Sequence, residues 1–186
     1  MKLQRVAQEA VKVVEAGIRA TIRTPREEPL AVSDAGTCAE SDREPREDRA
    51  LFISVKPQYA NAILDGTKTV ELRRTRPNLP DGSLVILYSS TPTKAVVGWA
   101  LLTRVREGTP GDIWNEFGAD AAIKEPDYDT YFDGAEHAIA LELDDVVAAS
   151  NPVPLSVIRS IGIQPPQSWR YVPAAITSQI QDSAAL

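Results

Sequence analysis

The sequence has few of the residues on which common metal and redox sites depend. Its 186 residues include one cysteine, Cys38, and one histidine, His137. A single cysteine excludes an internal disulfide framework and a cysteine-based zinc site, and it fits a reducing, cytoplasmic location. We interpret His137 as a packed or surface residue, and Asp127 and Asp129 as a solvated helix face. We therefore expect no metal and no other cofactor.

Long apolar runs and glycine-rich loops are also missing. No run reaches about 18 apolar residues, so we expect no transmembrane helix and no membrane partner. The first residues lack the apolar core and cleavage site of a signal peptide. Neither standard spacing of a glycine-rich phosphate loop occurs. The net charge of -6 excludes a uniformly basic nucleic-acid surface but permits a local basic site.

Composition divides the chain into four parts. Residues 1–23 have apolar side chains at steps of three and four, which predicts an amphipathic helix able to pack on the domain or on a second copy of the chain. Residues 24–49 are rich in charge and proline and predict a disordered linker. Residues 50–172 predict a barrel domain, and residues 173–186 a C-terminal tail with weak helical character.

The segment 50–172 alternates short strands with short helices. Pro57 suits the first turn of a helix, and Gly66 suits the left-handed position after its end. Gly98, inside a strand, indicates a bulge or a close backbone approach. Strands are predicted at 52–55, 68–73, 83–89, 95–105 and 135–143, and helices at 57–64, 113–117, 126–132 and 154–161. This pattern indicates an α+β fold, a small mixed β-barrel of about five strands with short peripheral helices.

The stretch 52–76 concentrates charge in a way that a hydrophobic core does not. Five cationic side chains surround Glu71, and we expect them to lie together if the strands 52–55 and 68–73 are neighbours. The two-residue period of a strand places alternate side chains on opposite faces. One face of 68–73 then carries Lys68, Val70 and Leu72, and the other carries Thr69, Glu71 and Arg73.

The charged and aromatic side chains could have catalytic, ligand-binding or structural roles. A lysine held near other cations has a lowered pKa, so Lys68 could act as a base. Glu71 could orient a guanidinium or accept a hydrogen bond from a base. The cations Lys56, Lys68, Arg73, Arg74 and Arg76 suit a site that holds an anion, and Tyr59, Tyr88 and Trp99 offer flat faces for an unstacked base. The alternative is purely structural, a ladder of charges on an exposed sheet face with aromatic side chains in the core.

The octet Gly66-Thr67-Lys68-Thr69-Val70-Glu71-Leu72-Arg73 resembles the GxKxxExR pattern of ASCH domains, which belong to the PUA-like β-barrel superfamily. The similarity continues in the preceding Ser54-Val55-Lys56-Pro57, in Leu87-Tyr88-Ser89-Ser90, and in Tyr131-Phe132-Asp133-Gly134. It covers roughly residues 51–145. The resemblance implies a PUA-like barrel that binds RNA or a modified nucleotide in a basic cleft. The implied ligand-binding residues are Lys56, Lys68, Glu71, Arg73, Arg74, Tyr88 and Ser89.

The resemblance leaves three functions open. The first is an RNA- or nucleotide-binding module. The second is a hydrolase with Lys68 and Glu71 as catalytic residues, either a ribonuclease or an enzyme similar to the N4-acetylcytidine amidohydrolases. In that branch a nucleophilic threonine stands three positions after the lysine, where this chain has Glu71. The third is a scaffold that acts through self-association of the helix 1–23.

Overall fold

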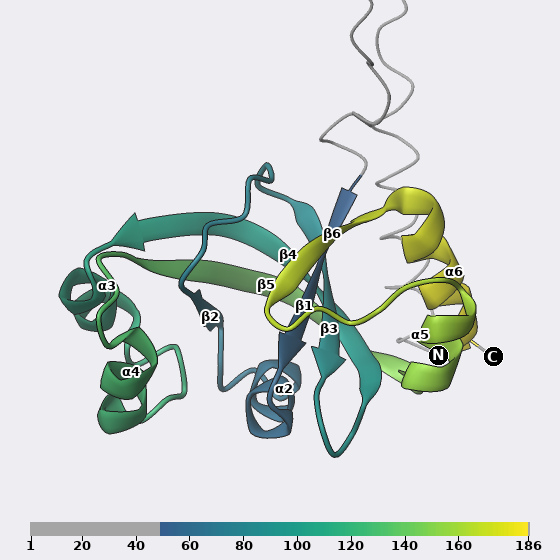
Figure 1. The fold of residues 1–186 in the computed structure, drawn as a ribbon, viewed down its shortest axis with the longest axis horizontal. Helices are drawn as coiled ribbons and strands as arrows, with labels where there is room; N and C mark the ends of the chain where they lie inside the picture. Colours follow the sequence, from purple (N-terminus) through teal and green to yellow (C-terminus); the bar gives the residue numbers. More distant parts are fainter. Residues whose placement is uncertain (1–48, 186) are drawn as a thin grey trace, which may run out of the picture. The chain divides into compact units, whose positions relative to one another are not determined.

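The computed structural model describes residues 49–185, in which six strands form one mixed sheet in the order β2-β5-β4-β3-β1-β6. Figure 1 shows this sheet with α3 and α4 at one end and α5 and α6 at the other. The strands are β1 (Arg49–Val55), β2 (Val70–Arg73), β3 (Ser83–Ser89), β4 (Ala95–Gly108), β5 (Ala138–Pro154) and β6 (Trp169–Pro173). The helices are α2 (Pro57–Leu64), α3 (Pro110–Phe117), α4 (Glu125–Phe132), α5 (Leu155–Ser160) and α6 (Ala174–Ala185).

Side chains join the two ends of the sheet. Strands β1 and β3 pair in parallel, and every other pairing is antiparallel. The strand β2 pairs with β5, so β1 and β2 are not ladder neighbours, which was the condition under which the cationic side chains were expected to lie together. The segment that follows β2 nevertheless meets β6, because Trp169 Nε1 donates to Thr75 O at 3.1 Å and the Tyr171 hydroxyl accepts from Asn78 N at 2.6 Å. The sheet thus curls into a barrel that is closed by side chains.

Three apolar clusters hold the fold together. The inner cluster takes side chains from α2 and from strands β1, β3, β4 and β5. A second cluster lies between the opposite face of β1 and β3 and the helices α5 and α6. A third packs α3 and α4 against β2 and β5. Since Val70 and Leu72 belong to this third cluster, the other face of β2 is turned toward the barrel interior.

The α+β class predicted from the sequence is confirmed, with differences in detail. Pro57 opens α2, Gly66 follows it with φ +80°, and Thr109 caps α3 by accepting from Asp112 N. The sheet has six strands rather than about five because residues 169–173, assigned no strand from the sequence, pair with β1. Strand β5 also continues to Pro154, well beyond the predicted 135–143.

The ends of the domain extend past the predicted limits. Arg49, placed in the linker by composition, already pairs with Pro173. The residues predicted as a tail form α6, whose Thr177, Ile180 and Ala184 are buried. The predicted helix 1–23 and almost all of the linker lie outside the described residues. No helix within residues 49–185 is long and apolar enough to cross a membrane.

Gly98 lies where β5 and α2 come closest to β4. The ladder between β4 and β5 shifts register between Val96 and Gly98, as the sequence predicted for a glycine inside a strand. A Cβ added at Gly98 would lie 2.6 Å from Val147 O and 2.7 Å from Leu64 Cδ2. The backbone carbonyl cannot move without breaking the sheet, so only glycine fits here.

Replacing Gly98 by alanine should therefore destabilise the protein by about 2–3 kcal/mol through overpacking. The matched control is Gly111→Ala, where the nearest atom to the new Cβ is Thr109 Oγ1 at 3.9 Å. That variant should change stability by less than about 0.5 kcal/mol. Urea unfolding of both variants measures the difference, and equal midpoints would contradict the close approach.

Candidate functional site

The turn before β2 places the charged side chains. Thr67 donates to the Asp65 carboxylate from its backbone N–H at 3.0 Å and from its hydroxyl at 2.6 Å. These hydrogen bonds lower the pKa of Asp65. Lys68 N then donates to Ala62 O at 2.9 Å, which fixes the chain against the end of α2 as it turns into β2. These local hydrogen bonds thus determine the position of the Lys68 backbone.

Lys68 is buried with all of its donors engaged. It is 3% exposed, and its Nζ donates to Val70 O at 2.7 Å and to Ala121 O at 2.6 Å. The same Nζ lies 3.3 Å from Glu71 Oε2. Strand alternation predicted Lys68 and Glu71 on opposite faces, and this is wrong because Lys68 precedes the first ladder pair of β2 and is free to bend back.

Glu71 and Arg73 continue the network toward the other edge of the sheet. Both are 6% exposed, and Arg73 Nη2 lies 2.9 Å from Glu71 Oε1. Arg73 Nη2 also donates to Ser54 O at 3.0 Å, and Nη1 donates to Ser168 Oγ at 3.3 Å. Arg73 therefore bridges β2, the end of β1 and the segment before β6. The contact among the three charges is local to the segment 68–73, whereas the curl of the sheet brings Arg73 to Ser54 and Ser168.

The electrostatics of this network are unbalanced. Two buried cations share one buried carboxylate, so the group carries an excess positive charge. Desolvation lowers the pKa of Lys68; Glu71 opposes this effect and Arg73 adds to it. Arg73 Nε is buried and has no hydrogen-bond partner among the described residues. Desolvation of buried charges is costly, and a buried donor without a partner adds to that cost.

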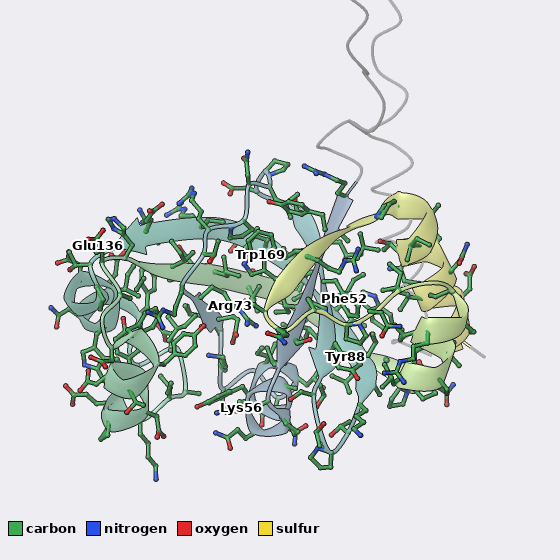
Figure 2. The ribbon with its side chains drawn as sticks, in the orientation of Figure 1. Phe52, Lys56, Arg73, Tyr88, Glu136 and Trp169 are labelled. Atoms are coloured by element: carbon green, nitrogen blue, oxygen red, sulfur yellow. The ribbon has the colours of Figure 1, made fainter. Side chains whose placement is uncertain are left out.

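Exposed groups surround the network. Lys56 is exposed at the start of α2, and the ring centre of Tyr59 lies 5.3 Å from Lys68 Nζ. Arg74 is exposed and its Nη2 donates to Asp133 O at 3.3 Å. Tyr131 is 38% exposed; burial raises its pKa, while the nearby Arg73 and Arg74 lower it and Glu71 raises it. Figure 2 shows Arg73 between the labelled Trp169 and Lys56.

Two other predicted site residues lie in the core. Tyr88 is 5% exposed and packs edge-on against Phe52 in the second cluster, on the opposite face of the sheet from the barrel interior. Burial raises the pKa of Tyr88, and Arg159 opposes this. Ser89 is 2% exposed at the end of β3. The structure therefore brings Lys68, Glu71 and Arg73 into contact and leaves Tyr88 and Ser89 outside that network.

Sequence reasoning missed two residues beside the network, Ser168 and Tyr131. Ser168 precedes β6, a strand whose only sequence signal was the two-residue spacing of Trp169 and Tyr171. Tyr131 was assigned to a helix, but its face could not be assigned because α4 has weak amphipathic character.

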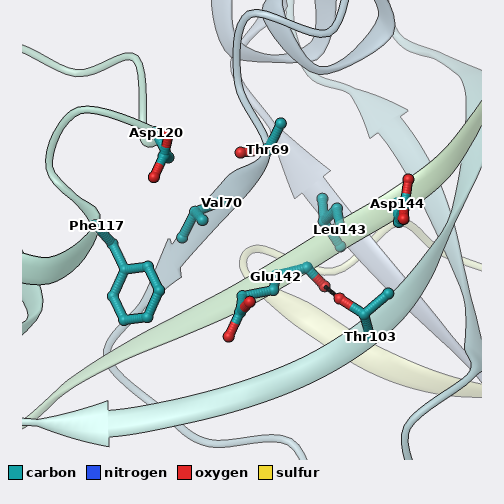
Figure 3. A pocket seen from close by; sticks show the side chains of 8 residues that line it. All are labelled: Thr69, Val70, Thr103, Phe117, Asp120, Glu142, Leu143 and Asp144. Carbon is teal, nitrogen blue, oxygen red and sulfur yellow. Dashed lines mark hydrogen bonds between the residues drawn. The ribbon is translucent and has the colours of Figure 1, made fainter.

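A separate cavity opens on the other side of β2. It has a volume of about 320 Å³, and Figure 3 shows Glu142 and Thr103 among its lining residues, joined by the hydrogen bond from the Thr103 hydroxyl to Glu142 O. Its lining combines hydroxyl, carboxylate and apolar groups from Thr69, Val70, Thr103, Phe117, Asp120, Glu142, Leu143 and Asp144. Within residues 49–185, no group of three or more histidine, cysteine or acidic side chains is arranged to hold a metal ion.

The geometry does not support a threonine nucleophile beside Lys68. Both oxygens of Glu71 face cations of the network. Thr69 is exposed and lines the cavity rather than the network. The arrangement instead suits a fixed, positively charged platform beneath an exposed surface.

Removing the shared carboxylate should disrupt this platform. Glu71→Gln leaves two buried cations without their counterion, so the free energy of unfolding should fall by about 3 kcal/mol. Glu107→Gln removes the partner of the exposed Arg76, at 3.5 Å, and should cost less than about 1 kcal/mol. Denaturant unfolding compares the two, and a similar small loss for both would refute a tightly coupled network.

Comparisons with known proteins agree with this architecture. The chain matches the ASCH domain family over residues 53–147. It is 33% identical over 142 residues to the ASCH domain-containing ribonuclease of Zymomonas mobilis, covering 72% of this chain and 95% of that protein. The crystal structure of ASCH from Zymomonas mobilis has a TM-score of 0.69 at 32% identity and covers 74% of this chain and 95% of its own.

A more distant match comes from a larger protein. The large ribosomal subunit protein uL22 of Ureaplasma parvum is 31% identical over 117 residues, which are 62% of this chain and 37% of that protein. The family match spans Lys68, Glu71 and Arg73. The chain belongs to the ASCH domain family.

Proposed function

We propose that this protein is a ribonuclease that binds single-stranded RNA over the Lys68–Glu71–Arg73 network. The observation that carries the proposal is the match along 95% of a relative named as an ASCH domain-containing ribonuclease. The surface around the network has the charge and the aromatic side chains that RNA binding requires.

The phosphate contacts come from the exposed cations. Arg74 directly follows the buried Arg73 at the end of β2, and Lys56 follows the end of β1, two residues after Ser54, whose carbonyl binds Arg73. The buried network beneath them has an excess positive charge, which attracts a phosphate without contacting it. Local attraction of this kind is compatible with the chain's net charge of -6.

Tyr131 supplies the stacking face for an unpaired base. Its ring is the exposed aromatic surface next to Arg73 and Arg74. Phe132 holds it edge-on, with the ring centres 4.8 Å apart. The raised pKa keeps the phenol protonated at neutral pH, so Tyr131 acts through its face or as a hydrogen-bond donor rather than as a base.

Lys68 and Glu71 are not assigned as acid and base in this proposal. A general base must offer a lone pair to the substrate. The Lys68 ammonium instead donates to two carbonyls and pairs with Glu71, and the Glu71 oxygens face Lys68 and Arg73. They support the surface on which RNA binds.

Labelled single-stranded RNA tests the proposal directly. The wild-type protein should bind it in an anisotropy assay and shorten it over time on a denaturing gel. Lys56→Ala with Arg74→Ala should weaken binding about tenfold at low salt. It should also reduce the magnitude of the salt slope by about 1.4, because two phosphate contacts are lost.

The control carries the same change in charge on other elements. Lys124→Ala with Arg104→Ala removes two exposed cations from the start of α4 and from β4. This variant should bind and cleave RNA as the wild type does. RNA that is neither bound nor shortened by the wild-type protein would refute the proposal, and equal losses in both double variants would refute this location for the site.

The two roles of Tyr131 can be separated by substitution. Stacking contributes about 1–3 kcal/mol per base, so Tyr131→Ala should weaken RNA binding by about fivefold or more. Tyr131→Phe keeps the ring and should bind RNA within about twofold of wild type. Anisotropy titrations measure both variants, and an equal loss in both would mean that the hydroxyl, not the ring face, contacts RNA.

A further inference from the structure

We infer that Arg73 acts on RNA through Ser168: the guanidinium fixes the Ser168 hydroxyl so that this hydroxyl donates a hydrogen bond to the RNA backbone. Arg73 is then a positioning residue and Ser168 a contact residue. The inference rests on the proposed function, since it specifies how the same site holds its ligand. It gives the buried charges of the ASCH pattern a role other than direct contact.

The segment before β6 is held at three points. Ser54 N donates to Ser168 O at 2.9 Å, and Ser54 Oγ donates to Pro166 O at 2.5 Å. Arg73 Nη2 binds Ser54 O at 3.0 Å while Nη1 binds Ser168 Oγ at 3.3 Å. One guanidinium therefore fixes both the strand that anchors the segment and the side chain at its end.

The hydroxyl of Ser168 can still donate one hydrogen bond. Its oxygen accepts from Arg73, so its proton is free to point away from the guanidinium. Ser168 is exposed, whereas Arg73 beneath it is 6% exposed. A hydroxyl that accepts from a cation is polarised into a better donor. An anionic phosphate oxygen is a strong acceptor for the Ser168 hydroxyl.

Arg73 is poorly placed to contact RNA itself, because it is 6% exposed. Its Nη2 binds both Glu71 Oε1 and Ser54 O, and one of the two Nη1 hydrogens is used by Ser168. The remaining Nε is buried. Lys68 and Glu71 are equally enclosed and hold Arg73 in place from behind. The chain of contacts runs from Lys68 through Glu71 and Arg73 to Ser168 and ends at the surface.

A double-mutant cycle on RNA affinity tests this chain of contacts. Ser168→Ala and Arg73→Gln should each weaken binding of a labelled single-stranded RNA about tenfold. The double variant should bind no more weakly than either single variant, because both changes remove the same contact. The salt slope should stay at its wild-type value in Ser168→Ala, which changes no charge, and should fall by less than about 0.7 in the two variants that lose the buried charge of Arg73, since no direct phosphate contact is lost.

The opposite result has a clear signature. If Arg73 contacted a phosphate directly, Arg73→Gln would reduce the salt slope by about 0.7, and the two losses would multiply to about a hundredfold in the double variant. Either finding would overturn the inference. Where thermal unfolding shows that Arg73→Gln does not fold, Arg73→Lys replaces it in the cycle, since lysine keeps the charge but lacks the planar fork needed to bind Ser54 O and Ser168 together.

Matched controls separate this inference from the proposed function. Ser150→Ala removes an exposed hydroxyl from β5, and Arg106→Lys alters an arginine paired with Glu116 and Glu142. Both should bind RNA as the wild type does. RNA binding that is absent in the wild type refutes the proposed function, whereas binding that is present with multiplicative losses refutes only the role of Ser168.

Discussion

The ion pair between Glu71 and Arg73 is the interaction on which the rest of the site depends. It lies at 2.9 Å on the inward face of β2, the strand at one edge of the sheet. Through Arg73 it reaches Ser54 on β1 and Ser168 just before β6, the strand at the opposite edge. With the hydrogen bonds of Trp169 and Tyr171 it closes the curled sheet where no backbone ladder does so.

A closure made of charges has a physical cost and a physical benefit. Burying two cations with one carboxylate is costly, and an apolar contact would close the same gap at lower cost. The charged closure gives an excess positive charge near the exposed Arg74 and Tyr131, and Lys56 is exposed just after the end of β1. An anionic, single-stranded ligand benefits from both properties, because its phosphates are attracted and its unpaired bases find a stacking face.

Local signals in the sequence predicted much of this structure. Pro57 and Gly66 marked the limits of α2, and Gly98 marked the bulge. Each of these signals depends only on the conformation of one residue or on residues next to it in the chain. The pattern from Gly66 to Arg73 also identified the charged cluster, because its spacing persists however the strand is placed.

Features that depend on distant contacts could not be predicted in the same way. The strand β6 forms because β1 offers it an edge more than a hundred residues away in the chain. Lys68 departs from strand alternation because Ala121 O and Glu71 attract its ammonium. Tyr88 is an aromatic residue of the right type for stacking, yet packing against Phe52 determines its position. Ser168 gains significance only once Arg73 reaches it across the barrel.

A crystal structure of the protein with a short single-stranded RNA tests the central claim most directly. The account predicts RNA phosphates at Lys56, Arg74 and the Ser168 hydroxyl and a base against Tyr131. Lys68, Glu71 and Arg73 should keep their present partners beneath the ligand. A phosphate bound directly to Lys68 or Arg73 with the Glu71 pairs broken, or RNA bound on another face of the sheet, would contradict it.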